Sequence, residues 1–298
     1  MDIAITGSSG LIGSALAASL RHAGHRVRPV VRRPVANDDE IRWDPTGGTI
    51  ETEKLEGVRA VVHLAGAGVG DKRWTPERKK EIRESRTIGT GTIARAVADA
   101  KVPVLVSGSA VGYYGDRGDE VLTEDSGPGT GFLATLCIDW EAATAPAEAS
   151  GARVAHIRTG IVLTPKGGAL AKLLPLFKLG AGGRMGSGRQ WWPWITLEDE
   201  VGAITHLLTA DAEGPHNLSA PNPATNAELT RALGRVLRRP TVLPVPAFGP
   251  RLLLGKELAA ALLEDSARVV PARLQSSGYE FAHPDLEPAL RALLVSKP

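Results

Sequence analysis

The stretch that decides the fold is Gly7-Ser8-Ser9-Gly10-Leu11-Ile12-Gly13, between an apolar run at 2–6 and a segment with helical spacing at 11–23. Glycines at this GxxGxxG spacing let the backbone turn sharply and approach a pyrophosphate closely. The amides and the dipole of the helix that begins there would hold the anion. Because strand, turn and helix follow in the required order, the stretch predicts a dinucleotide site and not merely a glycine-rich turn without a ligand. The predicted cofactor contacts in this stretch are Gly7, Ser9, Gly10, Leu11, Ile12 and Gly13.

Strand and helix signals alternate through the first two thirds of the chain. The expected strands are 2–6, 27–31, 60–64, 103–107 and 153–157, and the expected helices are 11–23, 87–100 and 139–149. The run at 60–64, AVVHL, is continuously apolar, as expected for a strand buried on both faces. Repeated strand–helix–strand units predict an α/β fold of the Rossmann type, with a doubly wound parallel sheet covered by helices on both faces.

The pattern changes after residue 164. Glycines and aromatic residues dominate 165–194, after which the sequence predicts a helix at 195–209, a short strand at 215–218 and a helix at 226–237. From 242 onward the chain is rich in proline, with apolar residues at helical spacing in 252–263. We therefore expect residues 1–164 to form the dinucleotide-binding domain, to which 195–240 return. Residues 165–194 and 241–298 are expected to form a smaller, mostly helical lobe on the substrate side.

Composition argues against several classes of function. The net charge is +2 and no basic cluster occurs, which argues against a nucleic-acid binder. Cys137 is the only cysteine, so neither an internal disulfide nor a multi-thiolate zinc site can form, and His63 has no second ligand at metal-binding spacing. The start lacks the features of a secretory signal, and no apolar run reaches the roughly 18 residues of a membrane span. These features predict a cytoplasmic protein without a metal, membrane or nucleic-acid partner.

Arg32 and Arg33 end the second expected strand, where the cofactor is chosen. An acidic residue about 20 positions beyond the glycines would bind the ribose 2′-hydroxyl of NAD. Arginine is instead suited to a 2′-phosphate, because its guanidinium binds phosphate through two parallel hydrogen bonds. A hydrogen bond to a charged group contributes about 1.5–3 kcal/mol, or about a tenfold to hundredfold preference. The sequence thus predicts NADP(H) over NAD(H), the alternative being that both arginines are solvated charges at a strand end.

Five segments resemble the extended short-chain dehydrogenase/reductases, the superfamily of sugar-nucleotide epimerases. They are GSSGLIG at 7–13, HLAGAG at 63–68, Gly89-Thr90, SGSAVGYYG at 107–115 and RTGIVL at 158–163. Two more, GSGRQWWPWI at 186–195 and VVPARLQSSGYEFAHPDLEPAL at 269–290, resemble a narrower, atypical epimerase-like branch with a small C-terminal domain of uncharacterised function. The resemblance covers nearly the whole chain, and the last two segments are its most specific motifs.

The resemblance implies further cofactor contacts at the carboxyl ends of the parallel strands. One group lies along the adenosine and pyrophosphate, and the others lie around the nicotinamide and its ribose. Glu81 would orient Arg86 or contact the cofactor, the alternative being an ion pair on the helix surface. The residues so implied are Leu64, Ala65, Gly66, Glu81, Arg86, Ser107, Gly108, Arg158, Thr159 and Gly160.

The catalytic pattern of the superfamily is incomplete in this chain. Ser109 matches the serine that its members use, but alignment on Glu141 puts Leu133 and Cys137 where the Tyr-x-x-x-Lys pair belongs. Leucine has no proton to give and a thiol supplies no fixed positive charge. Tyr113 and Tyr114 follow Ser109 closely, so either is a candidate for the missing phenol. The alternative is that both tyrosines pack the substrate cleft, and we expect Cys137 to be a small buried side chain.

The substrate side is expected to include Gln190 and Trp191, since aromatic walls with a few polar groups are typical of small-molecule pockets. The sequence therefore favours an NADP(H)-dependent oxidoreductase or epimerase-like enzyme that acts on a small polar substrate. The loss of the proton-transfer pair leaves a second hypothesis open, a non-catalytic NADP(H)-binding sensor or scaffold. The resemblance also implies a homodimer formed through the fourth and fifth helices.

Overall fold

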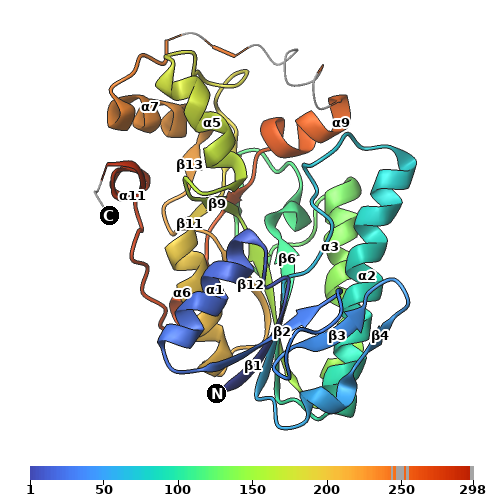
Figure 1. Ribbon diagram of the computed structural model, residues 1–298. Helices are drawn as coiled ribbons and strands as arrows, with labels where there is room; N and C mark the ends of the chain where they lie inside the picture. The colour runs from blue at the N-terminus through green and yellow to red at the C-terminus, as the bar shows by residue number, and fades with distance from the viewer. Residues whose placement is uncertain (243, 246–251, 253–254, 296–298) are drawn as a thin grey trace.

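The computed structural model describes residues 1–242, 244–245, 252 and 255–295 (Figure 1). Its centre is an eight-stranded sheet in which all neighbouring strands are parallel except the last two. In spatial order the strands are β12 (Gly214–Leu218), β8 (Arg153–Thr159), β6 (Val104–Ala110), β5 (Ala60–His63), β1 (Asp2–Thr6), β2 (Arg26–Val31), β3 (Ile41–Asp44) and β4 (Thr49–Ile50). The predicted α/β Rossmann fold is confirmed.

Helices cover both faces of the sheet, as Figure 1 shows. On one face α1 (Leu11–His22) and α6 (Leu197–Thr209) pack on Ile3, Val62 and Val106. On the other face α2 (Pro76–Asp99) and the short α4 (Ala145–Ala149) pack on strand residues such as Val61 and Leu105, and α3 (Phe132–Ala142) lies beside α2. Successive strand residues point to opposite faces, so each buried strand supplies both cores.

A smaller core lies beyond the carboxyl ends of the strands, built from segments far apart in the sequence. It combines α5 (Gly168–Lys178), α7 (Asn226–Leu237) and α11 (Leu286–Leu294) with two strand pairs. The pairs are β9 (Ile161–Leu163) with β11 (Trp194–Thr196), and β10 (Trp191–Trp192) with β13 (Ala224–Thr225). Leu170, Trp194 and Leu233 are buried together in this core.

The C-terminal segment ties the two cores together. After α9 (Lys256–Ala259) and the π-helical turn η3 (Ala260–Glu264), β14 (Arg268–Val269) pairs with β7 (Val121–Leu122). Leu274, in α10 (Ala272–Ser276), is fully buried in the core under α1 and α6, whereas Leu290, in α11, is fully buried in the smaller core. Within the described ranges, no helix is long and apolar enough to cross a membrane.

Several element boundaries differ from the sequence prediction. Helix α2 begins at Pro76 and not at 87, because Thr75 caps its first turn and proline suits the first helical position. The helix expected at 139–149 is two helices that meet at Ala143 and Thr144. Ile195 belongs to β11, so α6 starts at Leu197, two residues later than expected.

Of the helix expected at 252–263, residues 253–254 lie outside the described residues. Strands β3, β4, β7, β9, β10, β11, β13 and β14 and the 3-10 turns η1 (Thr52–Leu55) and η2 (Val111–Tyr114) were not predicted.

Candidate functional site

The turn after β1 lies at the point where the strand order reverses. From β1 the chain builds β2 and β3 on one side and then returns to build β5 on the other, so the strand order reverses between β1 and β5. Ligands of open α/β sheets bind at such a switch point. Gly7 has φ +66°, and a Cβ on Gly13 would lie 2.2 Å from the carbonyl oxygen of Gly7. Only glycine fits both positions, so the turn is as tight as a bound pyrophosphate requires.

The start of α1 has the properties of an anion site. Gly10 is its N-cap, no side chain caps the first turn, and that turn holds no acidic residue. The first amides of a helix have no partner within the helix and face its positive dipole end. Ser9 and Gly10 are exposed, and Leu11 and Ile12 are only partly buried, so a ligand can approach the start of the helix. The residues present therefore fit a dinucleotide.

The two arginines at the end of β2 are not equivalent. The Arg33 guanidinium donates to the Glu40 carboxylate (Nη1 to Oε2, 2.7 Å), and this bond lowers the pKa of Glu40. Arg32 is exposed and, in the part of the chain that the structure describes, its side chain has no hydrogen bond or ion pair. Arg32 is thus the guanidinium available to a 2′-phosphate, whereas Arg33 holds the following loop.

Thr6 fixes the segment after β5 beside the glycine turn, a role that the sequence reasoning missed. Its Oγ1 accepts hydrogen bonds from the amides of Leu64 (3.0 Å) and Ala65 (3.2 Å) and lies 2.8 Å from Nδ1 of His63. Burial lowers the pKa of His63 to about 3, so its ring is neutral and accepts the threonine proton. The Leu64 and Ala65 backbones are thereby placed against Gly7, and Gly66 follows them directly, as the cofactor prediction needs.

Arg86 and Glu81 do not pair. Glu81 is exposed and accepts from Arg78, while Arg86 is buried and donates to the carbonyls of Ala67 (2.9 Å) and Ile82 (3.2 Å). Burial lowers the pKa of Arg86 to about 10. Among the described residues no carboxylate pairs with Arg86, and a Cβ on Gly66 would lie 3.3 Å from its guanidinium carbon. The Arg86 charge thus lies beside the Gly66 backbone without a carboxylate partner in the described part of the chain, and its guanidinium stacks on the Trp140 ring at 4.7 Å.

Ser109 joins a buried polar network at the ends of β6 and β8. Its hydroxyl donates to Glu141 (2.6 Å), which accepts two hydrogen bonds from Arg158 (2.8 and 2.9 Å). Burial acts to raise the pKa of Glu141, but the hydrogen bonds and the charge of Arg158 outweigh it and lower that pKa. Glu141 is thus ionised at neutral pH. Glu141 served above only to align the chain with the superfamily, and the sequence did not predict its contacts with Ser109 and Arg158.

The two tyrosines after Ser109 have different environments. Tyr114 is fully buried, donates to Asn217 (2.7 Å) and accepts from Arg158 (3.0 Å), and burial raises its pKa to about 12. Tyr113 is half-buried, and its ring stacks on the Arg158 guanidinium at 3.5 Å. Tyr114 has no access to a substrate, so Tyr113 is the phenol of the pair that a ligand can reach.

Leu133 and Cys137 lie one turn apart on α3. Leu133 packs on Gly112, where an added Cβ would meet it at 3.1 Å, and the Cys137 thiol donates to the Ala110 carbonyl (3.5 Å). Burial raises the pKa of the Cys137 thiol to about 12. Neither side chain can move a proton at neutral pH, although both lie beside the strand end that carries Ser109. In the described ranges, no cluster of three or more His, Cys, Asp or Glu side chains could hold a metal ion.

The remaining predicted cofactor residues lie at the same edge of the sheet. Ser107 is buried, and its Oγ has no hydrogen-bond partner among the described residues. Gly108 leaves no room for a side chain, because a Cβ would lie 2.9 Å from the Trp140 ring. Gly160 is similarly tight against the Pro193 carbonyl (2.8 Å), while the Thr159 hydroxyl donates to Glu200.

The predicted substrate residues have structural contacts. Gln190 is buried, and its amide donates to the carbonyls of Met185 (3.1 Å) and Leu263 (3.0 Å), so it connects the loop that holds Met185 to η3. Trp191 is half-buried, donates to Asp119 (2.7 Å) and has Arg268 over its ring at 4.6 Å. Trp191 retains an exposed part that a ligand could touch.

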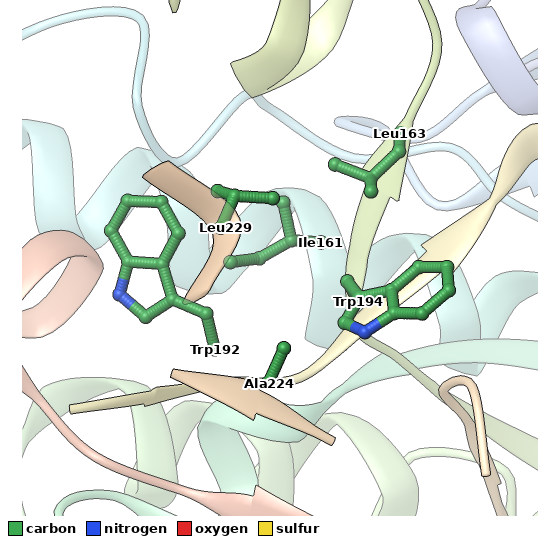
Figure 2. A pocket seen from close by; sticks show the side chains of 6 residues that line it. All are labelled: Ile161, Leu163, Trp192, Trp194, Ala224 and Leu229. Carbon is green, nitrogen blue, oxygen red and sulfur yellow. The ribbon is translucent and has the colours of Figure 1, made fainter. Parts of the chain in front are cut away.

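A small apolar pocket lies in the lobe core (Figure 2). Its free volume is about 10 Å³, close to the least that holds one water, so it is a packing defect rather than a substrate site. Its lining residues are Ile161, Leu163, Trp192, Trp194, Ala224 and Leu229.

Sequence comparisons match nearly the whole chain. Residues 3–220 match the model of a family described as the NAD dependent epimerase/dehydratase family, and 245–293 match a domain of unknown function, DUF1731. The chain is 48% identical to Epimerase family protein Mb2239 of Mycobacterium bovis, over 97% of this chain and 96% of the relative. It is 36% identical to Epimerase family protein SDR39U1 of Homo sapiens, over 99% of this chain and 100% of the relative.

Comparison with solved structures also matches the chain to epimerase family proteins. The crystal structure of human epimerase family protein SDR39U1 (isoform 2) with NADPH matches with a TM-score of 0.89 at 32% identity, over 98% of this chain and 99% of that one. A nucleoside-diphosphate sugar epimerase from Corynebacterium glutamicum matches with a TM-score of 0.80 at 39% identity, over 99% of this chain and 58% of that one.

Proposed function

This chain belongs to the NAD-dependent epimerase/dehydratase family, and we propose that it is an NADP(H)-dependent oxidoreductase or epimerase-like enzyme acting on a small polar substrate. The observation that carries the proposal is the combination of a helix start at Gly10 that no side chain caps with an exposed Arg32 guanidinium that has no partner among the residues that the structure describes. The first suits a pyrophosphate and the second a 2′-phosphate. The relative crystallised with NADPH supports the same choice of cofactor.

When bound, the nicotinamide would supply hydride transfer. The chain's own residues would orient the substrate and handle its proton. Because the Ser109 proton is directed to Glu141, the serine oxygen is left to accept a hydrogen bond from a substrate hydroxyl. Tyr113 is the proton carrier in this proposal, and Arg158 holds its ring in place. Trp191 would contribute an aromatic wall to the substrate side.

The cofactor preference is tested by calorimetry on ligand-stripped protein. We expect Arg32→Ala to weaken NADPH binding about tenfold to hundredfold and to leave NADH binding unchanged, since only NADPH carries the 2′-phosphate. Arg33→Ala is the matched control, because Arg33 is held by Glu40, and it should change the NADPH to NADH ratio far less. Absence of heat with either cofactor would refute the binding proposal, and equal affinities would refute the preference.

The catalytic assignment is tested by turnover with NADPH across carbonyl and sugar-nucleotide substrates. Tyr113→Phe should lower kcat by about 10²–10⁴-fold, the usual contribution of a positioned acid or base, and Ser109→Ala should also lower it. Tyr114→Phe is the control, because its hydroxyl is buried. Robust turnover that neither Ser109→Ala nor Tyr113→Phe reduces would contradict these roles.

The second candidate, a non-catalytic NADP(H) sensor or scaffold, is favoured by Leu133 and by the neutral Cys137 thiol at the positions of the usual proton-transfer pair. Such a protein would bind NADPH without turnover and change its affinity for a partner protein. Pull-downs with and without NADPH distinguish it from the enzyme. A sensor would capture its partner protein to a different extent when NADPH is present, and it would turn over no substrate.

A homodimer through α2 and α3 completes the proposal, in a cytoplasmic protein without nucleic-acid or membrane partners. Ile88 on α2 and Ile138 on α3 support it, since each is about two-fifths exposed (38% and 41%) despite being large and apolar. We expect Ile138→Glu to shift the mass measured by light scattering from dimer to monomer. A monomeric wild-type protein would rule the dimer out.

A further inference from the structure

Glu200 is a buried carboxyl group that the proposed reaction does not use. It lies near the start of α6 with no exposed surface, and its Oε1 accepts a hydrogen bond from the Thr159 hydroxyl (2.8 Å). Its Oε2 is also buried and has no hydrogen-bond partner in the part of the chain that the structure describes. Burial raises the pKa of Glu200 to about 8, against the smaller opposing effect of the Thr159 bond. At neutral pH the group is therefore mostly an uncharged acid.

The surroundings of Glu200 hold no compensating cation among the described residues. The helix that carries Glu200 packs, through Val201 and Ile204, in the apolar core that it shares with α1, β6 and β11. From the C-terminal segment, the Tyr279 hydroxyl donates to the Asp199 carbonyl (3.0 Å), and His283 pairs with the exposed Glu198. Arg158 neighbours Thr159 on β8, but its side chain points to the opposite face and pairs with Glu141. Glu200 therefore ionises without a nearby positive charge to hold it.

The position of Glu200 relates it to the nicotinamide, given the proposed NADP(H) site. Thr159 is the last residue of β8 and is in register with Ala110 of β6 and Leu218 of β12. A dinucleotide with its pyrophosphate on the Gly7 turn and its adenosine phosphate at β2 must extend its other half over β5, β6 and β8. With strands about 4.8 Å apart, β8 lies about 14 Å from β1, within reach of that half. The nicotinamide ring would then lie over the strand ends beside Thr159.

We propose that Glu200 determines which oxidation state of the nicotinamide the site prefers. The oxidised ring carries a positive charge and the reduced ring carries none. A carboxylate at Glu200 would attract the oxidised ring more strongly than the neutral acid does. The uncharged reduced ring would bind equally well to both forms of Glu200. Because Glu200 is covered, it acts through space and not by contact, and the low polarity of its surroundings extends the reach of its charge.

The test measures the dissociation constants of NADPH and NADP⁺ at about pH 6.5 and about pH 9. In the wild type, the affinity for NADP⁺ relative to NADPH should rise about tenfold over this range. This is the effect expected when bound NADP⁺ lowers the pKa of Glu200 by about one unit, because one pKa unit corresponds to a tenfold change in affinity. The 2′-phosphate is common to both forms, so its own titration cancels in the ratio. Glu200→Gln cannot ionise and should give a constant ratio. Glu198→Gln is the matched control, an exposed carboxylate on the same helix, and should behave as the wild type.

A second measurement needs no variant. Binding of NADP⁺ near pH 8 should release protons, seen as a dependence of the calorimetric heat on the ionisation enthalpy of the buffer, and binding of NADPH should release fewer. A ratio that is constant with pH in the wild type, or that still shifts in Glu200→Gln, would overturn the inference while leaving the cofactor site intact. Should neither cofactor bind, the proposed function itself fails, which is a separate outcome.

Discussion

At the scale of single residues, the cofactor turn depends on the absence of a side chain at Gly13. A Cβ there would lie 2.2 Å from a backbone oxygen, which cannot move without opening the turn. We expect Gly13→Ala to destabilise the protein by about 1–3 kcal/mol, as overpacking does, and to weaken NADPH binding. Urea unfolding and calorimetry measure the two effects.

Gly127→Ala is a suitable control for that substitution, because nothing lies within 4 Å of its added Cβ. If Gly13→Ala were as stable and bound NADPH as tightly as this control, the tight turn would not be the determinant of the site.

Glu200 also makes a prediction about stability. Its pKa is about 8 in the folded protein against 4.5 in the unfolded chain. The folded state therefore holds a proton that the unfolded state loses, and the stability from this group is full below pH 4.5 and is lost as the pH rises to about 8. Glu200→Gln should then raise the free energy of unfolding, relative to the wild type, more at about pH 8.5 than at about pH 5. Urea unfolding at both pH values checks this, and an equal difference at both would contradict it.

At the scale of elements, Arg153 links the start of β8 to the end of α6. Its guanidinium donates to the carbonyls of Leu207 (3.1 Å) and Leu208 (3.1 Å), which lie in the last turn of α6 and have no partner within the helix, and to the carbonyl of Ala212 (2.7 Å), which follows the helix. We expect Arg153→Met to lower the free energy of unfolding by about 2 kcal/mol, the contribution of hydrogen bonds to a charged group.

Arg59→Met serves as the control for Arg153→Met, since Arg59 is exposed. A loss no larger than that of this control would show that α6 ends without help from Arg153. Denaturant unfolding of the two variants side by side makes the comparison.

The sequence predicted those elements whose signals are local. Helix α7 was expected at 226–237 and is observed there, because Thr225 and Glu228 form a complete capping box and Arg238 ends the helix in the left-handed conformation. Strands β9, β11 and β14 were not predicted, because each is only two or three residues long and pairs with a partner distant in the sequence. Their formation depends on tertiary contacts that no local pattern encodes.

In the candidate site, too, the sequence predicted the features that local signals encode and missed the contacts between distant segments. The glycine turn and the arginine at the end of β2 follow from position in a strand–turn–helix unit. The bond from Ser109 to Glu141, the burial of Tyr114 and the contact of Thr159 with Glu200 join elements that are distant along the chain. A sequence alone names such residues at best as candidates, since burial and partners decide what each can do.

At the scale of the whole molecule, the C-terminal segment contributes to both cores. Leu274 is fully buried against α1 and α6, in the same cluster as Ile3 and Val62. We expect Leu274→Ala to cost about 2–5 kcal/mol, as for other buried leucines, and to lower the melting temperature of the entire chain in one transition. Leu252→Ala, at an exposed position, is the control.

Differential scanning calorimetry would detect the opposite result. Two separate transitions, of which only one responds to Leu274→Ala, would mean that the segment stabilises its own lobe and not the sheet.

The burial of Leu274 bears on how this protein is made. A ribosome synthesises β1 and α1 first, yet the core between α1 and α6 lacks one of its fully buried side chains until residue 274 has emerged. The nascent chain must therefore carry an incompletely covered apolar surface for most of its synthesis, the condition under which chaperones are recruited. Stalled or truncated products that end before α10 should accordingly be held by chaperones and degraded, whereas the full-length chain escapes.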